Sequence, residues 1–303
     1  MTFTCGPTHR RVTAPARAAA LAGLAMLACA GAATAEGVVL APHRAVYDIS
    51  LARASGGAGV VEASGRMVYE LTGSACEGYT QNMRFVTRMT NSEGSSQLND
   101  LRSSSFEDNT GKLFRFNSNS YKDEQLGDTT QGDASRAPGG VKVELTRPKK
   151  KSVTLSNSIY FPVQHSVALL EAARSGKSLF VGDLYDGSEK GEKIYSTTSA
   201  IGRRAAPGSL KIPASVKNGD VLDKLPSWPI AISYFEPNSD KKDAVPSYEL
   251  SFRYFENGVS TKLMIDYGEF AIKGELKEIT FLDAPKCDGK SGTAGATGVP
   301  GKR

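Results

Sequence analysis

The stretch YELSFRYFENGVSTKLMIDY, residues 248–267, decides the fold class of this chain. In its first half, apolar and aromatic residues alternate with polar ones; the apolar set is Tyr248, Leu250, Phe252 and Tyr254. A period of two places these side chains on one face of a β-strand, so the pattern predicts a half-buried strand. Asn257-Gly258 is a strong signal for a hairpin turn, and the alternation resumes from Val259 to Tyr267. The stretch therefore predicts two antiparallel strands joined by a tight turn.

The same period continues on both sides of this hairpin. A third run extends from Phe270 to Leu276, and its phase shifts near Lys277 and Glu278, which predicts a β-bulge. Toward the N-terminus, further strand-like runs cover residues 45–52, 65–71, 79–89, 96–106, 112–121 and 141–145. Turn signals between them lie at residues 56–59 and 108–111. Short strands at near-regular spacing predict an all-β chain, folded as an antiparallel sandwich or a barrel-like sheet.

One segment, FPVQHSVALLEAARSG at residues 161–176, departs from the period of two. Pro162 suits the first turn of a helix, while Arg174 and Gly176 suit its C-terminal end. Apolar residues recur at helical spacing, namely Val163, Val167 and Leu170. The segment predicts one amphipathic helix at about residues 162–175. We expect its apolar stripe to pack on the open concave side of a curved sheet.

The first 35 residues are typical of an export signal. Three arginines precede an apolar, alanine-rich segment, and Ala33-Thr34-Ala35 offers a cleavage site before Glu36. We therefore expect residues 1–35 to be removed during export to the periplasm, leaving a protein that does not span the membrane. The alternative is a lipoprotein anchored at Cys29, but Met26 is a poor first residue for a lipobox.

The rest of the chain predicts a single domain over residues 36–287, because no long flexible linker interrupts the strand pattern. The Gly-rich tail at residues 288–303 has almost no apolar side chain and is predicted to be disordered. Loss of the three signal arginines lowers the formal charge from +5 to +2. A nearly neutral protein has no electrostatic reason to bind nucleic acid.

Cys76 and Cys287 are the cysteines that remain after the signal is removed. In an oxidising compartment such a pair is typical of one disulfide, which for so long a loop stabilises by at most about 5 kcal/mol. Two other interpretations are weaker. A redox site is usually C-x-x-C, whereas these residues are far apart, and a zinc site needs further ligands, for which His43 and His165 are the available histidines.

His165 is the candidate for a catalytic base. A hydrolytic triad also needs a serine on a strained turn and an acid that orients the imidazole, and no G-x-S-x-G motif occurs after the signal. The sequence therefore favours a histidine that is packed or lies on the helix surface. With no assembled acid, base, nucleophile or metal set, we expect no enzymatic activity, no cofactor and no metal.

Two further features are candidate contacts with a ligand or partner. The acidic loop at residues 181–195 includes Asp183 and Asp186 and suggests calcium, but it lacks the D-x-D-x-D-G spacing of calcium loops. Asp186-Gly187 is typical of an ordinary hairpin turn. Trp228, the only tryptophan, stands at the start of a mostly apolar strand and either packs in the core or forms one wall of an apolar pocket.

Several stretches together resemble the EipB-type cell-envelope integrity proteins of Gram-negative bacteria, a family long of unknown function. The stretches are HRAVYDISL (43–51), SGRMVYELTGSACEGYTQNMRFVTRM (64–89), FPVQHSVALLEAARSG (161–176), YDGSEKGEKIYSTTSAIG (185–202), SWPIAISYF (227–235) and KCDG (286–289). The resemblance extends over about residues 41–287. Its motifs mark the fold and the cysteine pair, and they do not indicate a reaction.

The resemblance implies a periplasmic protein whose many antiparallel strands wind as an open spiral, or broken barrel, around one α-helix. In the family two cysteines form a disulfide, which corresponds to Cys76 and Cys287 here. Members are associated with maintenance of the envelope and resistance to agents that attack it. The family has no established enzymatic activity, so the resemblance gives no reason to expect one here.

The leading hypothesis is a non-enzymatic periplasmic protein that supports cell-envelope integrity as a binding or scaffolding module. Its unknown partner would be an envelope component: a periplasmic protein, a lipid or peptidoglycan. The first alternative is a periplasmic carrier of a lipid or other apolar ligand, suggested by the analogy between a spiral sheet and periplasmic lipid carriers. The third is an envelope hydrolase that uses His165 or the acidic loop. His165, Trp228, Asp183 and Asp186 are the candidate contact residues.

Overall fold

The structure is a computed structural model that describes residues 37–57, 59–236 and 245–287. The expected signal peptide, the alternative anchor at Cys29 and the expected tail lie outside these residues. The strands are β1 (His43–Ala54), β2 (Val60–Ser74), β3 (Gly78–Asn91), β4 (Ser96–Glu107), β5 (Leu113–Lys122), β6 (Gln125–Ala137), β7 (Gly140–Arg147), β8 (Lys151–Leu155), β9 (Leu179–Leu184), β10 (Tyr195–Ile201), β11 (Ser227–Phe235), β12 (Tyr248–Phe255), β13 (Ser260–Asp266) and β14 (Phe270–Phe281). The helices are α1 (Pro162–Arg174) and two 3₁₀ turns, η1 (Glu189–Gly191) and η2 (Gly219–Lys224).

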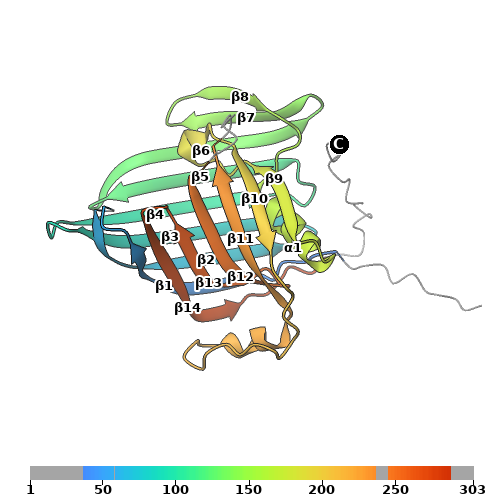
Figure 1. Cartoon of the computed structure of the whole chain (residues 1–303). Coiled ribbons are helices and arrows are strands. Elements are labelled where there is room, and N and C mark those ends of the chain that lie inside the picture. Colours follow the sequence, from blue (N-terminus) through green and yellow to red (C-terminus); the bar gives the residue numbers. More distant parts are fainter. Residues whose placement is uncertain (1–36, 58, 237–244, 288–303) are drawn as a thin grey trace, which may run out of the picture. The chain divides into compact units, whose positions relative to one another are not determined.

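All 14 strands form one antiparallel sheet in the order β8-β7-β6-β5-β4-β3-β2-β1-β14-β13-β12-β11-β10-β9. Two runs of consecutive hairpins meet where β1 pairs with β14. The edge strands β8 and β9 do not pair with each other, so the sheet is not closed into a barrel. The chain passes from one edge to the other through α1, which lies beside β9 in Figure 1. An all-β, open antiparallel sheet with one α-helix in the described part of the chain confirms the predicted fold class.

The face of the sheet that α1 covers is called the inner face here. The apolar residues predicted for one face of β12 lie on it, because Tyr254, Phe252 and Leu250 stand opposite the buried β11 residues Trp228, Ile230 and Ile232. These residues share a hydrophobic core with Leu169 and Leu170 of α1. Complete burial of a large apolar side chain contributes about 1.5–3 kcal/mol, so this packing holds the helix against the sheet.

The predicted hairpin and bulge are both present, and one further irregularity interrupts the pattern. Gly258 has φ +86° in the turn between β12 and β13. The register of β14 against β1 shifts at Lys277, which confirms the bulge predicted there. The alternation expected from Val259 to Tyr267 is broken at Lys262, where φ is +55° and the register against β12 also shifts. A non-glycine residue in the left-handed region is uncommon, and the sequence carries no signal for it.

Helix α1 begins at the predicted proline and ends one residue before the predicted boundary. Pro162 occupies the first turn, Arg174 the last turn, and Gly176 follows with φ +76°. The buried set is broader than the predicted stripe and consists of Val163, His165, Leu169, Leu170, Ala172 and Ala173. The helix is buried on this side because the apolar residues of this set share a hydrophobic core with side chains of β9, β10, β11 and β12.

Two strands were not expected from the sequence, β6 and β8, whereas β9 and β10 form the antiparallel pair that the hairpin predicted at Asp186-Gly187 requires, with a longer connection than a tight turn. Strand β6 shows the reason. Its buried positions are the small residues Thr130, Gly132 and Ala134, which alternate with exposed Gln131 and Asp133. Small and polar residues of low β-propensity conceal the period of two, and pairing with β5 and β7 on either side supplies the stabilisation.

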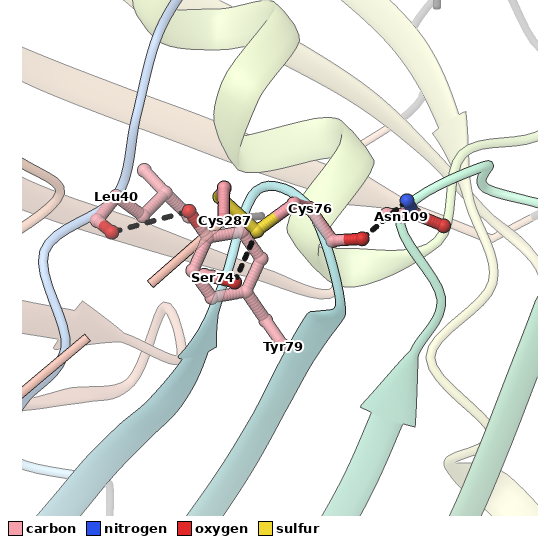
Figure 2. The surroundings of a disulfide bond; sticks show 6 residues. All are labelled: Leu40, Ser74, Cys76, Tyr79, Asn109 and Cys287. Atoms are coloured by element: carbon pink, nitrogen blue, oxygen red, sulfur yellow. Dashed lines mark hydrogen bonds between the residues drawn. A yellow bond between two sulfur atoms is a disulfide. The ribbon is translucent and has the colours of Figure 1, made fainter. Parts of the chain in front are cut away.

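Cys76 and Cys287 are joined by a disulfide across 211 positions of the chain (Figure 2). Cys76 lies in the turn between β2 and β3, and Cys287 lies beyond the end of β14. Ser74 Oγ is 3.1 Å from Cys76 Sγ, and the side chain of Asn109 donates a hydrogen bond to Cys76 O. The disulfide therefore attaches the segment after β14 to the turn between β2 and β3. In the sheet, only β1 lies between β2 and β14.

No helix within the described residues is both long enough and apolar enough to cross a membrane.

Candidate functional site

The segment between β9 and β10 crosses the inner face and is called the crossing segment (residues 185–191). A Cβ atom built on Gly187, which has φ +73°, would lie 2.3 Å from Cδ2 of Phe116 on β5. A Cβ atom on Gly191, with φ +74°, would lie 2.4 Å from Cδ2 of Leu145 on β7. Both distances are too short for atoms that are not bonded. At Gly187 the crowding by the Phe116 ring and the positive φ both require glycine, whereas at Gly191 the Leu145 side chain can move and the positive φ is the main reason for glycine.

Tyr185 fixes the start of the crossing segment. Its ring is fully buried and meets the rings of Phe114 and Phe116 edge to face, with centroid distances of 6.2 and 5.8 Å. Its hydroxyl donates a 2.9 Å hydrogen bond to Gly191 O at the other end of the segment. Aromatic pairs of this kind contribute about 0.5–1.5 kcal/mol beyond the area they bury. The ends of the segment are thus held while residues 186–190 remain beside β5 and β6.

The middle of the crossing segment is strained. Glu189 and Lys190 have φ values of +47° and +64°, in the left-handed region that disfavours residues with a Cβ atom. Such conformations cost about 1–3 kcal/mol each and persist only where the surroundings hold them. Here Tyr185 and the two glycines supply that constraint, so the backbone of Ser188–Lys190 is held against the inner face.

Two adjoining cavities lie between the crossing segment and strands β2–β6. The first has a volume of about 260 Å³ and is lined by Leu101, Ser118, Ser120, Asp128, Thr130, Ser188, Glu189 and Lys190. The second, of about 250 Å³, shares Leu101, Ser118 and Ser188 with the first. Its other lining residues include Tyr69, Gln81, Met83, Ser103, Ser105, Phe116, Pro162 and Asp186. The shared residues make the two cavities neighbouring parts of one surface.

One cross-strand row shows how the surface is built. Tyr69 stands opposite Met83, Met83 opposite Ser103, Ser103 opposite Ser118, and Ser118 opposite Thr130. Residues opposite each other in an antiparallel sheet share a face, so the five side chains form a continuous line across β2–β6. The row changes from aromatic and apolar to hydroxyl-bearing at Ser103. The inner face is therefore amphipathic at this site.

Asp186 and Ser188 provide the buried polar groups of the crossing segment. Asp186 Oδ1 accepts a hydrogen bond of 2.9 Å from the backbone N–H of Ser188, and burial raises the pKa of the Asp186 carboxyl. Ser188 Oγ is also buried, and although it makes no hydrogen bond of ideal geometry among the described residues, it interacts with the side chains of Asp186 and Tyr195 and opposes the rise in their pKa values.

A second polar centre lies at the start of α1, beside Pro162. Glu107 of β4 is buried, and its carboxylate accepts hydrogen bonds from the backbone N–H groups of Val163 and Gln164. Burial raises the pKa of Glu107 to about 8, against the opposite effects of these two N–H groups and of Arg136. These contacts satisfy free N–H groups at the helix start, so this centre positions α1.

Of the four candidate contact residues, Asp186 lies at the cavities and His165 does not. His165 is 4% exposed, and its Nε2 lies 2.9 Å from Thr197 Oγ1, whose hydrogen is donated to Gly182 O. The ring meets Tyr160 and Phe180 edge to face. Burial lowers the pKa of His165 to about 4. The imidazole is therefore neutral near pH 7, with its hydrogen on Nε2, and packs between α1 and β9–β10.

Trp228 and Asp183 also lie away from the two cavities. Trp228 is 2% exposed within the core beneath α1, and the guanidinium carbon of Arg204 lies 6.0 Å from its ring. Asp183 accepts a 2.8 Å hydrogen bond from Ser196 Oγ on the paired strand β10. In the part of the chain that the structure describes, no cluster of three or more histidine, cysteine or acidic side chains could hold a metal ion.

The sequence did not indicate the serines of the site. SSS at 103–105 and NSNS at 117–120 lie within segments that the sequence predicts as strands, and no motif sets them apart. Their signal lies in the pattern: hydroxyl and amide groups occupy both faces of β4 and β5, although a buried apolar face is expected for strands in the middle of a sheet. That signal could have marked an inner face left open to solvent or ligand.

Comparisons with known proteins agree with this architecture. A family model described as EipB-like matches residues 34–283. The Cell envelope integrity protein EipB of Brucella abortus (strain 2308) is 35% identical over 260 residues, which cover 85% of this chain and 90% of that protein. A crystal structure of a beta-barrel-like protein of a domain of unknown function from Brucella abortus matches with a TM-score of 0.75 and 35% identity, covering 82% of this chain and 100% of the other. The chain therefore belongs to the EipB-like family.

Proposed function

We propose that this protein supports cell-envelope integrity by binding an envelope component on its inner face, without catalysing a reaction. The observation that carries the proposal is the amphipathic row from Tyr69 to Thr130, which borders two cavities beside the crossing segment. Sites for small ligands typically combine apolar walls with a few fixed polar groups. The role in envelope integrity is drawn from the relative that bears that name.

The absence of catalysis is part of the proposal and rests on how the candidate groups are used. A covalent or acid–base mechanism needs a nucleophile and base within hydrogen-bond reach of each other. His165 is occupied by Thr197, and Asp186 binds the backbone N–H of Ser188. The serine that Asp186 contacts, Ser188, lines both cavities, but neither lining contains a histidine that could act as its base.

The periplasm is the proposed compartment, with residues 36–287 acting there as one domain after loss of the signal. Disulfides form and persist in oxidising compartments, and the Cys76–Cys287 bond fits that environment. Such a protein would meet peptidoglycan, lipids and other periplasmic proteins, so the partner is proposed to come from these classes.

Deletion of the gene tests the proposed role. We expect the deletion strain to become sensitive to detergents and to antibiotics that act on the cell wall, and a plasmid copy of the gene to restore resistance. Wild-type sensitivity of the deletion strain to several such agents would contradict the role in envelope integrity.

A carrier of a lipid or other apolar ligand is the second candidate. It is favoured by half-buried apolar side chains that extend the inner face beyond the cavities: Met67, Phe85, Leu250, Phe252, Leu263 and Ile265. Native mass spectrometry of protein purified from the periplasm should then detect a bound lipid. A spectrum with only the mass of the free protein would count against the carrier.

A further inference from the structure

We infer that the two adjoining cavities form one binding site for a neutral glycan built of hydroxylated, N-acetylated sugar rings. The inference rests on the proposed function and names the chemistry of its envelope ligand. Leu101, Ser118 and Ser188 line both cavities, so a ligand that fills one extends directly into the other. At about 250–260 Å³ each, the cavities are smaller than sites for large ligands and suit short segments of a chain-like molecule.

The hydroxyl-bearing wall matches sugar hydroxyl groups. Seven of the eight residues around the first cavity are polar, and four of them carry a hydroxyl: Ser118, Ser120, Thr130 and Ser188. A serine or threonine hydroxyl both donates and accepts hydrogen bonds, as does a sugar hydroxyl, so the two sets can satisfy each other in more than one orientation. Ser188 lines both cavities, and its Oγ is buried beside the carboxyl of Asp186.

The apolar wall matches the other surfaces of an N-acetylated sugar. Tyr69, Met83, Phe116 and Pro162 line the second cavity together with Leu101. The C–H faces of a sugar ring and the methyl of an acetamido group are apolar and bury favourably against such side chains. Gln81 in the same lining already donates a 2.8 Å hydrogen bond to Tyr69 Oη, and its amide oxygen can accept one from the N–H of the acetamido group.

The charges around the site disfavour an anionic ligand. Asp128, Asp186 and Glu189 supply three carboxyl groups to the combined lining, and Lys190 supplies its only positively charged group. Phosphate or carboxylate groups brought into this surface would meet like charge, and such juxtaposition reduces affinity. A phospholipid head group or an anionic polysaccharide is therefore a poor occupant, and a neutral glycan avoids the repulsion.

An acyl chain is also a poor occupant of the first cavity. It would cover the hydroxyls of Ser118 and Ser188 without offering them a hydrogen bond, and burial of unpaired polar groups is costly. Half-buried apolar side chains elsewhere on the inner face could bind a lipid, so the test below also includes an apolar ligand. They lie outside the linings of both cavities.

Isothermal titration of the purified, disulfide-bonded protein with tri-N-acetylchitotriose tests the inference. Ser118→Leu fills the wall that both cavities share, and Ser135→Leu is its matched control, because Ser135 is an exposed residue on the paired strand β6 and lines neither cavity. We expect the trisaccharide to bind, with little change in affinity at high salt. Ser118→Leu should weaken binding at least about tenfold, the equivalent of one or two lost hydrogen bonds, while Ser135→Leu should bind like the unmodified protein.

Lack of trisaccharide binding, or equal binding by Ser118→Leu and the unmodified protein, would overturn the inference. Binding of decanoate but not of the trisaccharide would replace the glycan with an apolar ligand. If circular dichroism shows that Ser118→Leu is unfolded, Ser188→Ala takes its place, and undiminished binding by that variant would likewise overturn the inference. Failure here leaves the role in envelope integrity open, because the phenotype of the deletion strain tests that role separately.

Discussion

Glu107 on β4 accepts a hydrogen bond from the backbone N–H of Val163 at the start of α1, 56 residues further along the chain. The contact joins the middle of the sheet to the one α-helix of the described residues. It also places a carboxyl group in the interior, at 2% exposure, beside the wall of the second cavity that Pro162 forms. One buried acid therefore holds the start of α1 against β4, while apolar packing holds the rest of the helix.

Glu107→Gln should remove a pH dependence of folding. Because burial raises the pKa of Glu107 to about 8, the folded state holds the proton more tightly than the unfolded chain does. The stability that this group contributes is present below its ordinary pKa near 4.5 and is lost as the pH rises through about 8. Urea unfolding across this range should show a decline for the unmodified protein and a smaller one for the variant. Equal slopes would contradict the assignment.

Glu107→Ala should destabilise the protein at every pH. It leaves the N–H groups of Val163 and Gln164 without an acceptor in a buried place, which costs about 1–3 kcal/mol. Glu144→Ala is the control, because Glu144 is exposed on β7 and should change the free energy of unfolding by no more than about 0.5 kcal/mol. A loss in the control as large as that of Glu107→Ala would show that the helix contact has no special role.

His165→Leu should make folding less sensitive to acid. The pKa of His165 is lowered to about 4, so the unfolded chain takes up a proton more readily than the folded protein between pH 6.5 and 4. The contribution of His165 to the free energy of unfolding is complete above pH 6.5. It decreases by up to about 3 kcal/mol as the pH falls from 6.5 to 4. Acid titration followed by tryptophan fluorescence should give a lower midpoint pH for the variant. An unchanged midpoint would show that another group controls acid unfolding.

The same variant separates binding from hydrolysis. His165 lies outside the linings of both cavities, so His165→Leu should restore resistance to a deletion strain as well as the unmodified gene does. An envelope hydrolase that uses this imidazole would lose complementation while the protein still accumulates at its normal level.

Cys76→Ser should lower stability without preventing the sheet from forming. The disulfide closes a loop of 211 positions, and the chain-entropy relation gives an upper limit of about 5 kcal/mol for its contribution. Thermal unfolding should occur at a lower temperature, and Cys287 of the variant should react with a thiol label. Equal labelling of the oxidised, unmodified protein would show that the bond does not form in solution.

Gly187→Ala should lower the free energy of unfolding more than Gly208→Ala does. Gly187 and Gly208 have similar φ values, +73° and +76°, but a Cβ atom would strike Phe116 at the first position and meet nothing within 4 Å at the second. Both changes carry a backbone cost of about 1–2 kcal/mol, and the crowding at Gly187 adds about 1–3 kcal/mol. Denaturant unfolding should resolve this difference. Equal losses would mean that the crossing segment does not press on β5.

The fold could be predicted from the sequence where side-chain period and turn chemistry agree. Alternation identified the inner face of β12, Asn257-Gly258 identified a hairpin, and the phase shift near Lys277 identified a bulge. Pro162 and Gly176 bounded α1. Each of these signals is local, and local propensity and tertiary packing favour the same structure there.

The candidate site could not be predicted in the same way. Of the residues proposed from the sequence, Asp186 lines a cavity, whereas His165, Trp228 and Asp183 are used for packing or for hydrogen bonds between strands. Ser103 and Ser118 stand opposite each other on β4 and β5, but Ser188 joins them only because the crossing segment between β9 and β10 lies over the inner face. Such contacts between distant segments depend on the path of the chain, which no local pattern records.

Complementation by a cavity variant tests the central claim most directly. A deletion strain carrying Ser118→Leu or Ser135→Leu would be challenged with a detergent and with a cell-wall antibiotic, after immunoblotting has shown equal amounts of both proteins. If binding on the inner face maintains the envelope, Ser135→Leu restores resistance and Ser118→Leu does not. Full resistance with Ser118→Leu, at normal protein level, would contradict the account.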